Sequence, residues 1–245
     1  MAITGTDRGT AANTTSSSTW TFSPASNFTT GSWAVCCIAM NNTHTNGEAF
    51  TTFTLTDSNG NTWTRRISPL YDPGAANAGV EGAIFTTPMD GGTITTGTTL
   101  TITTNITTSR HAVTIMEVIP TGGSTIDYVT GGVNAGGNTV TTGTITSGNM
   151  VIGGYFAEWD GAPTEDGDST NGTWSTQQGA FAGSTTSGIA CASQRKVVSA
   201  TATQTYNPTD AAGPDSILGW IELTETGGGG GGSGGWSGGG GGFGG

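Results

Sequence analysis

The sequence predicts an all-β protein with two tandem, related β-sandwich modules of the jelly-roll or immunoglobulin-like type, followed by a glycine-rich tail. Threonine makes up about a fifth of the 245 residues and glycine accounts for 44, whereas only 9% of residues are charged. This composition disfavours amphipathic helices, because β-branched side chains lose rotamer freedom in a helix and glycine costs more still. Strand-sized runs separated by turn residues recur roughly every 8–12 residues, which is typical of a sandwich.

A low-identity internal repeat is the reason for predicting two modules. A glycine opens an apolar run at residues 31–40 and again at residues 148–159. Downstream of each run, a turn rich in Asp, Asn and Gly leads into a tryptophan, Trp63 in the first copy and Trp174 in the second. The alignment continues through two more pairs of segments: residues 79–88 with 188–197, and residues 110–120 with 215–224. Such self-similarity predicts an internal duplication.

Composition divides the chain into five segments. They are an N-terminal arm (1–18), a first module (19–120), a linker (121–138), a second module (139–226) and a tail (227–245). The arm is polar and lacks periodicity, so we expect it to be an extended arm that lies on a neighbouring subunit, or to be mobile. The linker carries one short predicted strand at residues 125–129. In the tail, 15 of 19 residues are glycine, which predicts disorder in isolation, with Trp236 and Phe243 as apolar anchors for a partner.

Three local patterns give specific structural expectations. Residues 32–40 are almost continuously apolar, which predicts a central strand buried on both faces. Residues 57–61, Asp-Ser-Asn-Gly-Asn, lie between runs at 51–56 and 62–68 and predict the tip of a hairpin, because these residue types tolerate positive φ. A further strand is expected at residues 173–177.

The charge balance argues against nucleic acid and membrane partners. The net charge is −11, Lys196 is the only lysine, and basic residues are adjacent only at Arg65–Arg66 and Arg195–Lys196. A phosphate-binding surface needs clustered Lys and Arg, so nucleic acid is not expected to bind. No apolar run is long enough to span a bilayer, and the N-terminus lacks the pattern of a signal peptide. We therefore expect any extracellular role to follow cell lysis.

Cysteine and histidine give no catalytic motif. Cys36 and Cys37 are adjacent and Cys191 is distant, so the three do not form a disulfide framework, and we expect buried thiols. His44 lies in a polar loop and His111 at the start of a strand, each outside any recognised catalytic spacing. The sequence also lacks the HExxH and CxxC patterns.

An acidic loop offers the one candidate metal site. Five carboxylates fall between residues 158 and 168: Glu158, Asp160, Glu165, Asp166 and Asp168. Hard oxygen ligands at Asp166 and Asp168 suit Ca²⁺, although the spacing departs from the EF-hand pattern. The alternative is a solvated acidic loop that only contributes net charge. No other cofactor is expected.

Tryptophan is frequent, with seven in the chain. Trp63 and Trp174 occupy equivalent places in the repeat, which favours a role in the core over a role in ligand binding. Trp159, in the acidic loop, and Tyr71, in a proline-rich loop, are better candidates for exposed contacts with a ligand or partner, such as stacking against a sugar.

One motif resembles a known group of proteins. Residues 57–64, Asp-Ser-Asn-Gly-Asn-Thr-Trp-Thr, resemble a hairpin in uncharacterised β-sandwich proteins of tailed bacteriophages, and the glycine-rich end is similar to that of some phage tail adhesins. The resemblance implies a non-enzymatic protein of the virion surface, either a capsid decoration protein or a tail-fibre component. It implies other virion subunits as partners in a homo-oligomer, with a host-surface glycan as a further ligand.

Two other readings stay open. The first is a secreted or surface carbohydrate-binding module that uses Tyr71 and Trp159. The second is a glycan-cleaving enzyme, which would need Glu48 paired with Glu158 or Asp160 across facing modules. The lack of a recognisable catalytic constellation favours binding or structure over catalysis.

Overall fold

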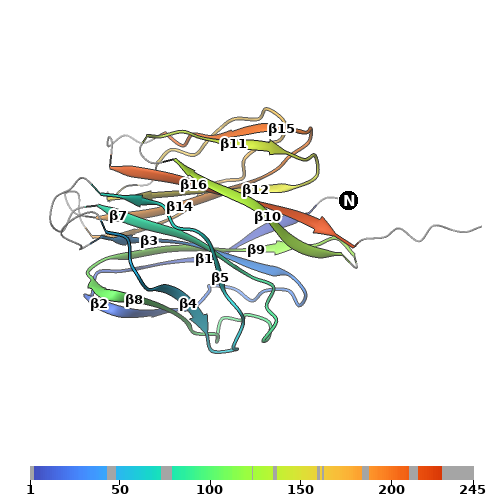
Figure 1. Ribbon diagram of the computed structural model, residues 1–245. Helices are drawn as coiled ribbons and strands as arrows, with labels where there is room; N and C mark the ends of the chain where they lie inside the picture. Colours follow the sequence, from blue (N-terminus) through green and yellow to red (C-terminus); the bar gives the residue numbers. More distant parts are fainter. Residues whose placement is uncertain are drawn as a thin grey trace, which may run out of the picture.

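The protein is all-β, as the sequence predicts. The computed structural model describes residues 3–42, 48–72, 79–122, 124–134, 137–158, 161, 163–183, 188–209 and 215–227. Within this part of the chain there are sixteen strands and no helix, so no helix there could cross a membrane. The strands form antiparallel sheets stacked in four layers (Figure 1).

The first half of the chain supplies two of the layers. Its strands are β1 (Thr4–Asn13), β2 (Ser17–Phe22), β3 (Trp33–Asn41), β4 (Phe53–Asp57), β5 (Thr64–Ile67), β6 (Leu70–Tyr71), β7 (Val80–Thr87), β8 (Leu100–Thr108) and β9 (His111–Ile119). We call the large sheet, in the order β1-β9-β3-β7-β5 with β6 also paired to β7, sheet A. The small sheet, in the order β2-β8-β4, is sheet B and forms the lowest layer in Figure 1.

The second half supplies the other two layers. Its strands are β10 (Thr125–Asn134), β11 (Val140–Ile145), β12 (Met150–Ala157), β13 (Gln178–Ala182), β14 (Ile189–Val197), β15 (Ala202–Tyr206) and β16 (Ser216–Thr226). Sheet C has the order β10-β16-β12-β14-β13, and sheet D pairs β11 with β15 at the top of Figure 1.

The two large sheets have the same topology. Each strand of sheet C corresponds in chain order and in sheet position to a strand of sheet A. Trp33 and Met150 take equivalent places at the start of β3 and β12. Each follows a turn that contains a glycine in the left-handed region, Gly31 with φ 84° and Gly148 with φ 91°. Common strand order, register and turn geometry are what an internal duplication predicts.

Sheets A and C pack face to face, and we call their interface the seam. The contacts across the seam are reciprocal, because β1 of sheet A lies against β13 of sheet C, while β10 of sheet C lies against β5 of sheet A. An approximate two-fold axis therefore relates the halves, as in an isologous dimer. Separate apolar cores fill the seam, the space between sheets A and B, and the space between sheets C and D.

Strand β3 shows why the apolar run at residues 32–40 carries no polar alternation. Val35, Cys37 and Ala39 belong to the seam core, and the residues between them belong to the core between sheets A and B. The strand is thus buried on both faces, which confirms the prediction. The three cysteines are buried and free, as expected, and burial raises the pKa of the Cys37 thiol to about 12.

The prediction of an N-terminal arm at residues 1–18 is wrong for most of that segment. Residues Thr4–Asn13 form β1, which pairs with the whole of β9 at the edge of sheet A, and β2 begins at Ser17. Ile3 is 1% exposed and anchors the start of β1 in the seam core. An edge strand needs only one partner and one apolar face, so its sequence can be polar and weakly periodic.

The predicted linker at residues 121–138 also contains structure. The expected short strand at 125–129 continues to Asn134 as β10, the first strand of the second half. A bulge between Tyr128 and Thr130 interrupts its pairing with β16, so the alternation of side chains changes phase within the strand. Because of this phase change, residues 130–134 do not continue the period-two alternation of residues 125–129, and the sequence pattern does not identify them as strand.

The turn at residues 57–61 is not a hairpin tip. It connects β4 in sheet B to β5 in sheet A and so crosses from one layer to the next. The Asp57 carboxylate holds this arch, because it accepts hydrogen bonds from the Asn59 N–H (2.8 Å) and the Trp63 Nε1–H (2.6 Å). Residues 173–177, predicted as a strand, are irregular, and β13 begins directly after them.

Candidate functional site

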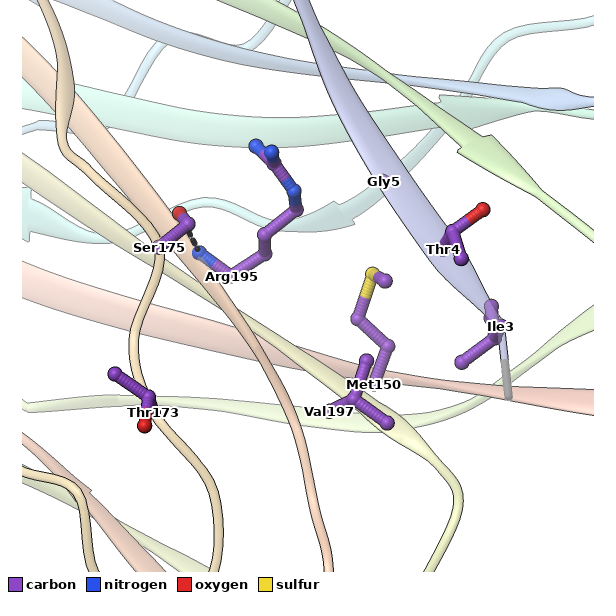
Figure 2. A pocket seen from close by; sticks show the side chains of 8 residues that line it. All are labelled: Ile3, Thr4, Gly5, Met150, Thr173, Ser175, Arg195 and Val197. Atoms are coloured by element: carbon purple, nitrogen blue, oxygen red, sulfur yellow. Dashed lines mark hydrogen bonds between the residues drawn. The ribbon is translucent and has the colours of Figure 1, made fainter. Parts of the chain in front are cut away.

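A pocket of about 420 Å³ lies at one end of the seam. We call it the seam groove, and Figure 2 shows it from close by. Its walls come from β1, β12, β14 and the irregular segment before β13, through the following residues: Ile3, Thr4, Gly5, Met150, Thr173, Ser175, Arg195 and Val197. The groove thus combines the N-terminal strand with segments from the second half of the chain.

Arg195 is the charged side chain of the seam groove. It forms an ion pair with Asp7 of β1, and its backbone N–H donates to the Ser175 hydroxyl oxygen at 3.1 Å. The Arg195 side chain extends from β14 towards β1 (Figure 2) and passes close to Gly5 on its way to Asp7. A Cβ on Gly5 would stand 2.3 Å from Arg195 Cδ, so the glycine is what lets the arginine take this path.

The groove combines one guanidinium with hydroxyls and an apolar floor. The hydroxyls come from Thr4, Thr173 and Ser175, and the floor includes Met150 and Val197. A guanidinium offers a flat face for stacking, and a methionine thioether makes favourable contacts with aromatic rings. The chemistry therefore suits a ring-shaped ligand with one apolar face.

The opposite end of the seam is acidic. The Glu158 carboxylate accepts a hydrogen bond from the Gly79 N–H at 2.6 Å, and the Tyr71 hydroxyl donates to Asp215 Oδ1 at 2.7 Å. The pKa of Glu158 is raised, first by burial and then by the charges of Asp215 and Asp72, although the bond from Gly79 opposes the shift. These groups connect the two halves across the seam.

Tyr71 is therefore partly committed within the chain. Its hydroxyl is bonded to Asp215 and its ring packs at the border of the seam core, so it is half-buried rather than an open platform. Trp159, Trp236 and Phe243, the other predicted contact residues, lie outside the described residues. Asp160, one of the two proposed carboxylate partners of Glu48, lies outside them as well. No protein-family model, curated protein or solved structure matches this chain.

The predicted calcium ligands are engaged with donors of the chain itself. Asp166 is buried and accepts hydrogen bonds from the N–H groups of Asn207 and Asp168, both at 2.8 Å. Asp168 accepts from the Thr170 N–H and faces the Lys196 ammonium at 3.2 Å. Among the described residues there is no cluster of three or more potential metal-ligating side chains. A calcium ion at this place would have to displace these bonds.

The repeated tryptophans are core residues, as predicted. Trp174 is 5% exposed, packs at a ring distance of 5.0 Å from Tyr206, and donates its indole N–H to the carbonyl of Thr205. Trp63 packs against the core between sheets A and B and donates its indole N–H to Asp57.

The described histidine has a structural environment. His111 is 2% exposed, its Nε2 lies 2.5 Å from the Thr108 hydroxyl, and its ring stacks on Trp20. Burial lowers its pKa to about 4, so it is neutral near pH 7. His44 lies outside the described residues.

The residues of the seam groove were not expected from the sequence. Gly5 and Asp7 fell in the supposed arm, and Arg195 was noted only as one member of a basic pair. Gly5 and Arg195 are 190 positions apart, and no local pattern links them. The available signal was the glycine inside the alternating run Ile3-Thr-Gly-Thr-Asp7, since glycine within a strand often marks a close approach.

A buried carboxylate in β7 predicts a pH effect on stability. Glu81 is fully buried and accepts hydrogen bonds from the Phe50 N–H at 2.7 Å and the Ser68 hydroxyl at 3.0 Å. Burial raises its pKa from 4.5 to about 7, against the opposing effect of these bonds and of the Arg65 charge. Between these values the native state retains a proton that the unfolded chain has released, so stability falls as the pH rises.

We expect Glu81→Gln to remove this dependence, because the amide keeps the shape and carries no charge. The free energy of unfolding of the variant should exceed that of the unmodified protein by about 3 kcal/mol at pH 8 and match it near pH 4.5. Urea denaturation at the two pH values measures the difference, with the exposed Glu165→Gln as control. A wild-type stability that rises from pH 5 to pH 7 while that of Glu81→Gln stays flat would contradict the assignment.

Proposed function

We propose that the chain is a non-enzymatic structural subunit of the surface of a tailed-phage virion, as a capsid decoration protein or a tail-fibre component. Its action is to bind neighbouring subunits. The setting is supported by the resemblance of residues 57–64 and of the glycine-rich end to phage proteins. The mode of action is supported by the edge strand β10.

Strand β10 has the properties of an edge strand that can pair with a strand of another subunit. It is ten residues long, lies at the edge of sheet C and pairs on one side with β16. Val129 and Val133 are 47% and 48% exposed, and Asp127 is the one charged residue of the strand. Natural edge strands are usually shortened, charged or covered, because a long apolar edge pairs with other chains.

The other long edge strand is covered, which makes β10 distinctive. The carbonyl of Arg8 in β1 accepts a hydrogen bond from the Ala25 N–H at 2.7 Å, and the carbonyl of Gly9 accepts one from the Gln178 side chain at 2.8 Å. Strand addition to β10 by a second copy would extend sheet C across two subunits with backbone hydrogen bonds. Antiparallel pairing of two β10 strands gives a two-fold contact.

The test is the association state of the full chain. We expect the wild-type protein to dimerise with increasing concentration in sedimentation velocity, and Val129→Lys/Val133→Lys to stay monomeric with an unchanged unfolding midpoint. Phe181→Lys, at the opposite edge of sheet C, is the matched control, because Phe181 is also exposed at 39%. A wild-type protein that stays monomeric at high concentration and does not bind intact particles would refute the proposal. Glycan binding lost in Tyr71→Ala would favour the carbohydrate-binding alternative.

A further inference from the structure

The seam groove has a two-fold-related counterpart in the other half of the molecule. Gly5 of β1 pairs with Val118, and Tyr128 of β10 pairs with Leu223. Val118 and Leu223 in turn pair with the first residues of β3 and β12. Gly5 and Tyr128 therefore occupy equivalent positions, one beside the groove and one at its counterpart.

At the counterpart position, the Tyr128 ring stacks on the Arg66 guanidinium. Arg66 Cζ lies 4.4 Å from the centroid of the Tyr128 ring, within the range of a cation–π contact. Tyr128 and Trp33 both pack against the seam core at this corner. At the Gly5 corner the guanidinium is present as Arg195, although it comes from a different strand, and no ring accompanies it among the described residues. The 420 Å³ groove is the space beside that guanidinium.

An aromatic side chain of the same polypeptide lies within reach. The described chain leaves sheet C at Gly227, four residues after Leu223, which pairs with Met150 of the groove. Four strand residues correspond to about 13 Å. The nine residues from Gly227 to Trp236 span up to about 30 Å when extended, so the tail can double back to the groove. The intervening residues are glycine and serine, which impose little steric restriction on such a path.

We propose that the seam groove binds the indole ring of Trp236 from the tail of the same chain. The ring lies on the Arg195 guanidinium and contacts the Met150 methyl group, which restores at the Gly5 corner the arrangement that Tyr128 makes with Arg66. This binding does not depend on the virion setting or on pairing through β10.

Methionine methyl resonances of the full chain test the proposal. The chain contains five methionines, and Met150, which is 1% exposed, lines the groove from the seam core, whereas Met40, Met89 and Met116 are buried in the cores and do not line it. In protein labelled with ¹³C at the methionine methyl groups, we expect Trp236→Ala to shift the Met150 resonance, because a ring current is lost. The other three buried methyl resonances should not move.

Two variants and a dilution series make the outcome decisive. Phe243→Ala removes the other aromatic residue of the tail and should leave the Met150 resonance in place. Gly5→Tyr displaces the Arg195 side chain, since a Cβ there would stand 2.3 Å from Arg195 Cδ, and it places a ring in the groove, so in that background Trp236→Ala should have no effect. The proposal is overturned if the chemical shift of the Met150 methyl resonance does not change in Trp236→Ala, or if it changes equally in Phe243→Ala. A shift that disappears on dilution also overturns it, because the ring would then come from a second copy.

Discussion

Glu117→Ala is expected to lower the free energy of unfolding by about 3–5 kcal/mol, the usual cost of removing one partner from a buried ion pair. Glu117 is fully buried in β9 and forms a salt bridge with Arg8 of β1. It also accepts hydrogen bonds from the Thr29 N–H at 2.5 Å and from the Ser32 hydroxyl at 2.6 Å. The alanine variant leaves the Thr29 N–H without this acceptor and the Arg8 guanidinium without its counter-charge, while the Ser32 hydroxyl keeps only the Thr29 carbonyl at 2.7 Å.

The pH dependence of this contribution follows from the pKa of Glu117. Burial raises the pKa, but the hydrogen bonds from Ser32, Thr29 and Arg8 outweigh burial, so the net pKa is lowered. A lowered native pKa means that the stabilisation is complete above the ordinary pKa of glutamate and is lost as the pH falls through the native value. The difference between wild type and Glu117→Ala should therefore be large at pH 7 and shrink in acid.

Urea denaturation at pH 7 and at decreasing pH measures both effects. Glu165→Ala is the control, because Glu165 is exposed and such a change should cost within about 0.5 kcal/mol. A loss below about 1 kcal/mol for Glu117→Ala at pH 7 would show that the buried pair does not hold β1 to the fold.

Phe156→Ala is expected to lower the free energy of unfolding by about 3–5 kcal/mol, which is the second large effect. Phe156 is fully buried in the seam core. Its ring occupies space left by two glycines, because a Cβ on Gly82 would stand 2.4 Å from Phe156 Cγ and one on Gly154 would stand 2.8 Å from Cζ. Neither glycine has a side chain that could fill the cavity.

At the equivalent place in the other half of the molecule, a small residue takes the place of the phenylalanine and two larger residues take the places of the glycines. By the register of the strands, Ala39 is equivalent to Phe156, while Cys37 and Cys191 are equivalent to Gly154 and Gly82. All of the equivalent side chains belong to the seam core. One corner thus combines a large residue with two glycines, and the other combines alanine with two cysteines.

A double-mutant comparison tests this equivalence. Gly82→Cys and Gly154→Cys together should destabilise the wild type, because they collide with the phenyl ring. In the Phe156→Ala background the same pair should recover at least about 1 kcal/mol by filling the cavity, so the sign of their effect reverses. Thermal and urea unfolding of the four proteins measure it. Equal effects in both backgrounds would contradict the packing described.

The fold class and the most buried strand could be predicted from the sequence because they depend on local signals. Threonine and glycine content excludes helices, and the continuous apolar run of β3 indicates burial on two faces. Sheet assignment could not be predicted, because Asp57–Asn61 has the same turn chemistry whether the next strand pairs with the previous one or crosses to another layer. Strand β1 was missed because its apolar contacts begin at Ile3 and its backbone bonds come from a strand 100 residues away.

The candidate site was harder to predict than the fold. Tyr71 is half-buried at the border of the seam core, and its bond to Asp215 spans 144 positions and has no local signature. The acidic pair Asp166 and Asp168 was noticed for its charge, whereas its neighbours in space include the ammonium of Lys196. The seam groove depends on the absence of a side chain at Gly5, and a missing atom is visible only once the facing strand is known.

The pseudo-symmetric seam also bears on how this molecule can change. In a homodimer of single modules, every substitution appears at both corners, so a tyrosine that fills one cavity fills the other. Covalent fusion of two such units in one polypeptide removes that constraint. Tyr128 and Gly5 can then differ independently, and one corner of the seam can be specialised while the other is not.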